Sequence, residues 1–382
     1  MPASDAVVTW LHFGDLHITV AQAENHRDFL ALIDMANRHL AGAVDFAYLP
    51  GDNADGGTDA QFALVRACLD RLRIPTHVIP GDHDFATRRL DGFYRELGAR
   101  PLPYATRVAG HRCLFLDIVS AGGGGLDFRL DGAQLDWLEA EVIDATAAGE
   151  GVALFMHAYP ADLRAGGDRL RTLLARHHVA CIDMGHTHYN ELANDGRTIY
   201  AATRSIGQVE EGPPGFSVAA IDGGIVSWRF APLGGGWPLV LITGPADHRL
   251  ITRPAAHDQV LSGPWVDVRA KVWGATSVTR VTARLGAGDP LPLLPAPDDG
   301  TRWTGRLGLG GVADGLHRLT VRAEDAAGQA GEETITVLVD PAGRHLLRAP
   351  HADGSDRDAV GAWPEKHIAG TQLGPNRNGR AW

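Results

Sequence analysis

The chain has 382 residues, of which 45% are hydrophobic and 21% are charged, and its formal net charge is −11. This length exceeds what one hydrophobic core usually serves, so we expect two domains. The acidic balance argues against a broad basic surface for nucleic acid, and no apolar run approaches the roughly 20 residues that span a bilayer. We therefore expect neither nucleic acid nor a membrane as a partner.

Apolar runs alternate with amphipathic stretches up to about residue 230. β-Branched and aromatic residues bounded by Gly, Pro and Asp make the runs strand candidates, and apolar spacings of three and four make the other stretches helix candidates. Such alternation predicts an α/β layered domain over residues 1–233. The expected strands are 7–13, 46–49, 77–79, 113–118, 152–156, 179–184, 198–202, 216–221 and 225–230, and the expected helices are 24–40, 59–72, 88–97 and 134–143.

The pattern changes after Gly234–Gly236. Segments such as 265–273, 317–323 and 333–339 alternate in twos between frequent Gly, Pro and Asp turns. This pattern predicts a C-terminal immunoglobulin-like or fibronectin-like β-sandwich over residues 239–340. Residues 341–382 have the composition of an irregular tail, but its tryptophans favour docking on this chain or on a neighbour. The β-sandwich or the tail is thus a candidate surface for a homo-oligomer.

The N-terminus and the cysteines indicate a compartment. The first residues lack the basic region and apolar stretch of a secretion signal. Cys68, Cys113 and Cys181 lie far apart inside apolar segments, which fits neither a disulfide framework nor a zinc-binding spacing. We predict buried free thiols and a cytoplasmic location.

Five short clusters of polar residues each follow an apolar run. Because the carboxyl ends of strands in an α/β sheet open onto a shared crevice, the clusters can converge in space. Asp and His are ligands for divalent metals of borderline hardness. Each cluster alone is more often a turn or a buried side chain, so the joint occurrence carries the prediction. The clusters are Asp15-Leu16-His17, Gly51-Asp52-Asn53, Gly81-Asp82-His83-Asp84, His157, and Gly185-His186-Thr187-His188.

Spacing within the clusters suggests how ions would be shared. Asp15 and His17 lie two residues apart, so both point the same way in an extended segment and could bind one ion. His186 and His188 have the same spacing, although at a turn each could reach a different ion. A carboxylate has two oxygens and can bridge two ions, and Asp52 is our candidate for the bridge.

The series resembles the calcineurin-like metallophosphoesterase superfamily, whose pattern runs Asp-X-His, Gly-Asp, Gly-Asn-His-Asp/Glu, His and Gly-His-X-His. All five blocks occur in that order over roughly residues 8–230. Within the superfamily, residues 49–52, 79–84 and 134–138 look most like the bacterial class III cyclic-nucleotide phosphodiesterases. The resemblance implies a four-layered α/β/β/α sandwich and two divalent or trivalent metal ions, typically manganese, iron or zinc.

Carried over by position, the resemblance gives a role to each motif residue. Asp82 departs from the family, which has Asn there, and this puts the substrate in doubt; we expect Asp82 still to ligate, as an oxygen donor that adds negative charge. The first metal would be held by Asp15, His17, Asp52 and His188, and the second by Asp52, Asp82, His157 and His186.

The resemblance further implies in-line attack on phosphorus by a hydroxide held between the metals. His83 would stabilise the transition state or protonate the leaving oxygen. Asp84 would orient His83, or cap the following helix, or do both. The favoured substrate is a small phosphodiester. The alternatives are a nuclease or phosphomonoesterase acting on a macromolecule, and a catalytically weak metal-binding or interaction protein.

A few neighbouring positions stay open. Asn53 adjoins a ligand and is either a substrate contact or a turn residue, and Arg204 is a phosphate contact or a surface residue. The run Gly122–Gly125 is a loop near the site or a linker between strands.

Overall fold

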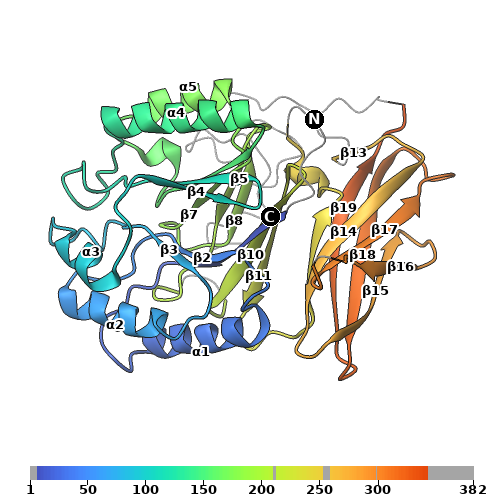
Figure 1. The fold of residues 1–382 in the computed structure, drawn as a ribbon, viewed down its shortest axis with the longest axis horizontal. Helices are drawn as coiled ribbons and strands as arrows, with labels where there is room; N and C mark the ends of the chain where they lie inside the picture. Colours follow the sequence, from blue (N-terminus) through green and yellow to red (C-terminus); the bar gives the residue numbers. More distant parts are fainter. Residues whose placement is uncertain (1–6, 210–211, 253–258, 298, 343–382) are drawn as a thin grey trace.

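The computed structural model describes residues 7–209, 212–252, 259–297 and 299–342 (Figure 1). Two stacked sheets with helices on both outer faces occupy the N-terminal part, and a third sheet lies beside them. All but the first two residues of the predicted tail, 341–382, lie outside the described residues, so its docking stays a prediction.

The first sheet has five strands, with β1 at its centre. β1 pairs in parallel with β2, which pairs in parallel with β3, while β10 runs antiparallel to β1 and to the edge strand β11. Helices α1, α2 and α3 cover its outer face (Figure 1). The bounds are β1 (Val7–Phe13), β2 (Phe46–Leu49), β3 (Thr76–Val78), β10 (Gly215–Asp222), β11 (Ile225–Pro232), α1 (Glu24–His39), α2 (Asp59–Leu69) and α3 (Asp91–Leu97).

The second sheet has six strands in the order β4-β5-β6-β7-β9-β8. Its four inner strands are parallel and its two edge strands are antiparallel. Helices α4 and α5 cover its outer face (Figure 1). The bounds are β4 (Tyr104–Val108), β5 (His111–Phe115), β6 (Gly151–Phe155), β7 (Cys181–Met184), β8 (Glu191–Asn194), β9 (Ile199–Ala202), α4 (Gly132–Ala148), α5 (Gly167–Arg176) and the short 3₁₀ helix η1 (Pro160–Asp162).

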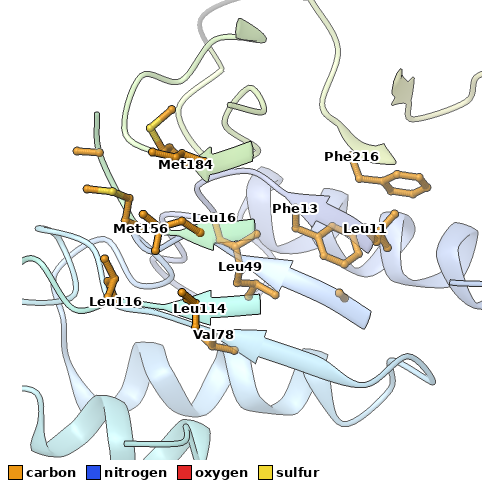
Figure 2. Close-up of a cluster of buried hydrophobic side chains, with 14 of the residues drawn as sticks. Leu11, Phe13, Leu16, Leu49, Val78, Leu114, Leu116, Met156, Met184 and Phe216 are labelled. Carbon is orange, nitrogen blue, oxygen red and sulfur yellow. The ribbon is translucent and has the colours of Figure 1, made fainter. Parts of the chain in front are cut away.

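The alternation of side chains along a strand explains the layering. On β1, Val8 and Trp10 belong to the apolar cluster between the two sheets. Leu11 and Phe13 point the other way, into the cluster that also includes the helices, and Figure 2 shows both among the buried side chains of that cluster. Both faces of each sheet are therefore buried, and the predicted α/β/β/α arrangement is confirmed.

A polar group crosses the apolar layer between the sheets. The indole Nε1 of Trp10 donates to Asp183 Oδ2 over 2.6 Å, and His12 Nδ1 lies 2.7 Å from Asp183 Oδ1. The hydroxyl of Tyr48 lies 3.3 Å from the backbone oxygen of Asp183. These contacts join β1 and β2 of one sheet to β7 of the other, and a buried network of this kind fixes one relative position of the layers.

The predicted elements match the structure closely, with three omissions. The strands at 7–13 and 46–49 have the predicted bounds, and most other elements shift by one to three residues at an end. Strands β4 and β8 and helix α5 were not predicted. β4 joins β5 through Ala109 and Gly110, whose φ angles of 46° and 73° are typical of a tight hairpin turn. The three cysteines are free and buried, as predicted.

The C-terminal sheet has eight strands in the order β12-β14-β17-β16-β15-β18-β19-β13. Val240 and Val268 from one half of this order share a buried cluster with Val321 and Val337 from the other half, so the sheet folds back over its own core. Its immunoglobulin-like class and the boundaries 239 and 340 stay predictions. The bounds are β12 (Leu239–Gly244), β13 (Val260–Leu261), β14 (Trp265–Trp273), β15 (Val278–Leu285), β16 (Leu291–Pro295), β17 (Arg302–Gly308), β18 (Gly315–Asp325), β19 (Ala330–Val339) and the 3₁₀ helix η2 (His248–Leu250).

Among the described residues, no helix combines the length and the apolar character that crossing a membrane requires.

His77 on β3 should make the free energy of unfolding depend on pH. Its ring stacks on Phe115 at 4.5 Å, and burial lowers its pKa to about 4. The unfolded imidazole has a pKa of about 6.5, so stability is fully present above pH 6.5 and is lost as the pH falls towards 4. Replacing His77 by Phe should reduce the loss of unfolding free energy between pH 7.5 and pH 5 by about 1–2 kcal/mol.

Urea titrations with a metal chelator present, at both pH values, measure this difference. Equal pH dependence of the parent protein and the His77→Phe variant would contradict the assignment.

Candidate metal centre

The structure brings all seven predicted ligands together at one end of the two sheets. Each follows a strand, because parallel strands deliver their carboxyl ends to the same edge. Asp15 and His17 follow β1, Asp52 follows β2, Asp82 follows β3, His157 follows β6, and His186 and His188 follow β7.

The seven residues form two groups of four that share Asp52. In each group the potential ligand atoms lie within 4.8 Å of one another. Asp52 Oδ2 lies 3.6 Å from His17 Nε2, and Asp52 Oδ1 lies 3.5 Å from His157 Nε2, so one oxygen faces each group. The first group is Asp15, His17, Asp52 and His188, and the second is Asp52, Asp82, His157 and His186. These sets match the predicted assignment, and ligation by each residue stays a prediction.

Four of the seven have left-handed backbone conformations. The φ angles are 43° for His17, 51° for Asp52, 65° for His186 and 62° for His188. Such angles are uncommon outside glycine, and they gather at functional sites where the surrounding structure enforces them. Here the backbone N–H of His17 donates to the Asp52 carbonyl over 2.8 Å, which joins two of the strained turns.

A glycine allows the backbone to approach the cluster. Gly51 has a φ of 116°, and a Cβ atom there would lie 2.5 Å from His157 Nδ1. That nitrogen is 2.8 Å from the Pro50 carbonyl and therefore donates its proton to it. Nε2 then faces Asp52 and Asp82, which is the orientation that a metal-binding imidazole needs.

The donor set fits cations. Asp15 and Asp52 are buried, and burial raises the pKa of Asp15 well above its ordinary value. Asp15 Oδ1 has no hydrogen-bond partner among the described residues, and His17 Nε2 faces His188 Nε2 at 3.1 Å. Buried carboxylates and facing ring nitrogens are costly without a shared cation. Manganese, iron and zinc all suit such nitrogen and oxygen donors.

Asp82, the residue that departs from the family pattern, contacts two of the predicted histidine ligands. Asp82 Oδ1 lies 3.1 Å from His157 Nε2 and 3.3 Å from His186 Nδ1. Burial acts to raise its pKa, but hydrogen bonds from the two imidazoles outweigh this and hold the pKa far below the ordinary value. Asp82 is therefore ionised. The two groups of ligands together contain three aspartates, Asp15, Asp52 and Asp82.

Replacing Asp82 by Asn should weaken metal binding by about 10- to 100-fold, because a neutral amide oxygen replaces a carboxylate. At saturating manganese the variant should keep its turnover or exceed that of the parent, because less ligand charge leaves the ions stronger Lewis acids. Calorimetric titration of manganese and kcat at saturating metal measure the two effects. Tighter manganese binding by the variant would contradict the role given to the extra charge.

His83 lies beside the cluster and is held at one ring nitrogen. Its backbone N–H donates to Asp52 Oδ1 over 2.9 Å, and its Nδ1 lies 2.7 Å from the Asp55 carbonyl oxygen. Nδ1 therefore donates, and Nε2 has no hydrogen-bond partner among the described residues. Burial lowers its pKa, but the charges of Asp52 and Asp82 and the bond to Asp55 outweigh burial, so the pKa is raised.

Asp84 has a different role from the one predicted. It is fully buried and accepts hydrogen bonds from the backbone N–H groups of Gly81 at 3.0 Å, Asn53 at 3.2 Å and Ala54 at 2.9 Å, and from the Asn53 side chain. It does not bond to the His83 ring. It is not a helix cap, because α3 begins at Asp91 with Leu90 as its N-cap. Asp84 instead ties the turn bearing Asp52 to the turn bearing Asp82.

Three side chains next to the ligands were not predicted. Asp55 Oδ1 lies 3.4 Å from His17 Nδ1 and 3.6 Å from His83 Nδ1. Gln208 Nε2 lies 3.2 Å from the same nitrogen of His17. The ring of Phe128 packs edge-on against His186 at 4.9 Å. The Asp three residues after Asp52 was visible in the sequence, but Gln208 and Phe128 come from distant loops and give no local signal.

The structure also locates the neighbouring residues whose roles the sequence left undecided. Asn53 is buried, and its amide donates to the Ile79 carbonyl over 3.0 Å, so it is a structural turn residue. The guanidinium of Arg204 lies over the Phe230 ring at 4.2 Å. Gly122–Gly125 lies in the loop that leads to Phe128, beside the second group.

Comparison with known proteins agrees with this geometry. Residues 8–190 match the family model for calcineurin-like phosphoesterases, a segment that includes every predicted ligand. This part of the chain belongs to the calcineurin-like metallophosphoesterase superfamily. Membership implies a dinuclear metal centre, for which the two groups around Asp52 supply the candidate ligands.

The chain is also similar to individual known proteins. It is 31% identical over 166 residues to glycerophosphodiester phosphodiesterase GpdQ of Enterobacter lignolyticus, a match that covers 40% of this chain and 57% of that protein. A dimetal phosphatase from Danio rerio has a TM-score of 0.49 at 17% identity, covering 59% of this chain and 96% of that one. Purple acid phosphatase PPD1 from yellow lupin has a TM-score of 0.46 at 12% identity, covering 62% of this chain and 53% of that one.

Proposed function

We propose that the protein is a dinuclear-metal phosphodiesterase that cleaves a diester of a small molecule. The observation that carries the proposal is the position of Asp52, which offers one oxygen to each group of four ligands. A pair of metals a few ångströms apart is a recurrent site for phosphoryl transfer. The name of the glycerophosphodiester phosphodiesterase relative supports a diester substrate.

The metals, when bound, lower the pKa of water and neutralise charge on phosphoryl oxygens. The chain's own residues would orient the groups around them. The bond from His157 Nδ1 to Pro50 keeps Nε2 towards the second site. Among the described residues, His83 Nε2 has no hydrogen-bond partner; burial lowers the pKa of the ring, but the charges of Asp52 and Asp82 outweigh burial and favour the protonated imidazolium. His83 would donate that proton to the leaving oxygen, as a general acid does.

Rates on two chromogenic substrates test the proposal. With manganese bound, kcat/KM for bis-p-nitrophenyl phosphate should exceed that for p-nitrophenyl phosphate by at least about tenfold. A faster monoester would instead support a phosphomonoesterase. No turnover with manganese, iron or zinc would support a metal-binding or interaction protein. Elemental analysis of protein purified without added metal would identify the native ions.

A further inference from the structure

A loop beside the second group of ligands joins β5 to α4 and carries the run Gly122–Gly125. At its base, Phe128 is buried and its ring packs against His186 at 4.9 Å and His157 at 5.8 Å. Arg164 Nε donates to the Leu126 carbonyl over 3.2 Å, which holds the other side of the loop. The loop therefore lies against the candidate metal centre.

Arg88 reaches this loop from the segment that follows His83. A Cβ atom built on Gly124 would lie 3.6 Å from Arg88 Nε and 3.8 Å from Arg88 Cζ, so the guanidinium lies at the glycine tip. Arg88 is exposed and has a φ of 58°, a conformation that arginine rarely adopts. Arg88 follows His83 by five positions in the sequence. The side chain is thus placed between the turn of His83 and the loop of Phe128.

The charges around the loop leave this guanidinium available. Arg89 pairs with Asp91, and Arg129 pairs with Asp127 at 2.8 Å. Within the part of the chain that the structure describes, Arg88 has no ion pair and no side-chain hydrogen bond. Asp127 is the only acid in residues 122–129, and it also accepts from the Gly123 N–H over 2.7 Å. Residues 86–91 and 122–129 together therefore carry a positive net charge, in a chain whose overall charge is −11.

We propose that Arg88 determines specificity by binding a second anionic group, on the alcohol part of the phosphodiester. A guanidinium presents a planar set of donors that matches a carboxylate or a phosphate. The reacting phosphoryl group would be bound at the two groups of metal ligands. The guanidinium of Arg88 lies outside those groups, so it would select for a negative charge elsewhere in the substrate. This inference rests on the proposed function and refines its substrate class.

Two phosphonates that are not hydrolysed separate the inference from catalysis. Propylphosphonate and 2-carboxyethylphosphonate differ by one carboxylate, and calorimetry gives both dissociation constants on manganese-loaded protein. The parent should bind the carboxylate form about three- to tenfold more tightly, the range of an exposed ion pair. Arg88→Ala should bring this ratio to about one. Arg89→Ala is the matched control, because Arg89 is exposed, adjacent and already paired with Asp91, and it should keep the parent ratio.

Raising the salt concentration to about 0.5 M should also reduce the parent ratio, because exposed charges are screened. Equal ratios in the parent and in Arg88→Ala, or no preference in the parent, would overturn the role of Arg88. Loss of the ratio in Arg88→Ala together with absent diester turnover would overturn the proposed function and leave the anion site standing.

Discussion

Asp52→Asn is expected to lower kcat by about 10³-fold or more and to reduce the bound metal from two ions towards one. Each carboxylate oxygen faces a different group of ligands, at 3.6 Å from His17 Nε2 and 3.5 Å from His157 Nε2. An amide keeps one oxygen but replaces the other with a nitrogen that carries two protons and no ligand lone pair.

Metal content by elemental analysis and kcat on bis-p-nitrophenyl phosphate measure the effect of Asp52→Asn. Asp59→Asn is the control, because Asp59 is an exposed residue of α2 whose ion-pair partner among the described residues is Arg95. Two tightly bound ions in Asp52→Asn would show that Asp52 does not bridge.

His83→Ala is expected to lower kcat by about 10²- to 10³-fold while both metals remain bound. Its ring contributes no atom to either group of four ligands, and its Nδ1 is committed to the Asp55 carbonyl at 2.7 Å. If Nε2 protonates the leaving oxygen, the loss should be larger for an alkyl leaving group than for p-nitrophenolate, which needs little protonation.

Rates of the parent and the variant on methyl p-nitrophenyl phosphate and dimethyl phosphate compare the two leaving groups. An equal loss on both would show that His83 stabilises charge and does not transfer a proton. Loss of metal from His83→Ala would show that the ring also supports the ligands.

The sequence was sufficient to predict the ligands because they sit at the ends of apolar strands. Each of the seven is within about four residues of a strand that its own composition reveals, and parallel strands deliver these ends to one edge. The four-layered arrangement followed from the family resemblance. The strand–helix alternation alone predicts layers but does not determine how sheets stack.

The surroundings of the ligands were less predictable, because they depend on contacts between distant loops. Asp84 was expected to orient its neighbour His83, yet its carboxylate turns inward to the backbone of Asn53, Ala54 and Gly81. Sequence proximity therefore gave the wrong partner. Gln208 reaches His17 across 191 positions of the chain, and no local pattern predicts such a contact. Edge strand β4 was missed because the adjacent Thr106 and Arg107 interrupt its short apolar run.

Each group of candidate ligands takes residues from both sheets, so metal binding should be coupled to folding. In the first group His188 comes from the six-stranded sheet and its three companions from the five-stranded sheet. In the second group, two residues come from each. An ion in either group would thus fasten the two sheets together, and neither sheet could separate without releasing it. By mass action, such binding stabilises the folded chain by an amount that grows with the free metal concentration. The metals would then act as structural clamps between the layers, besides any part they take in chemistry.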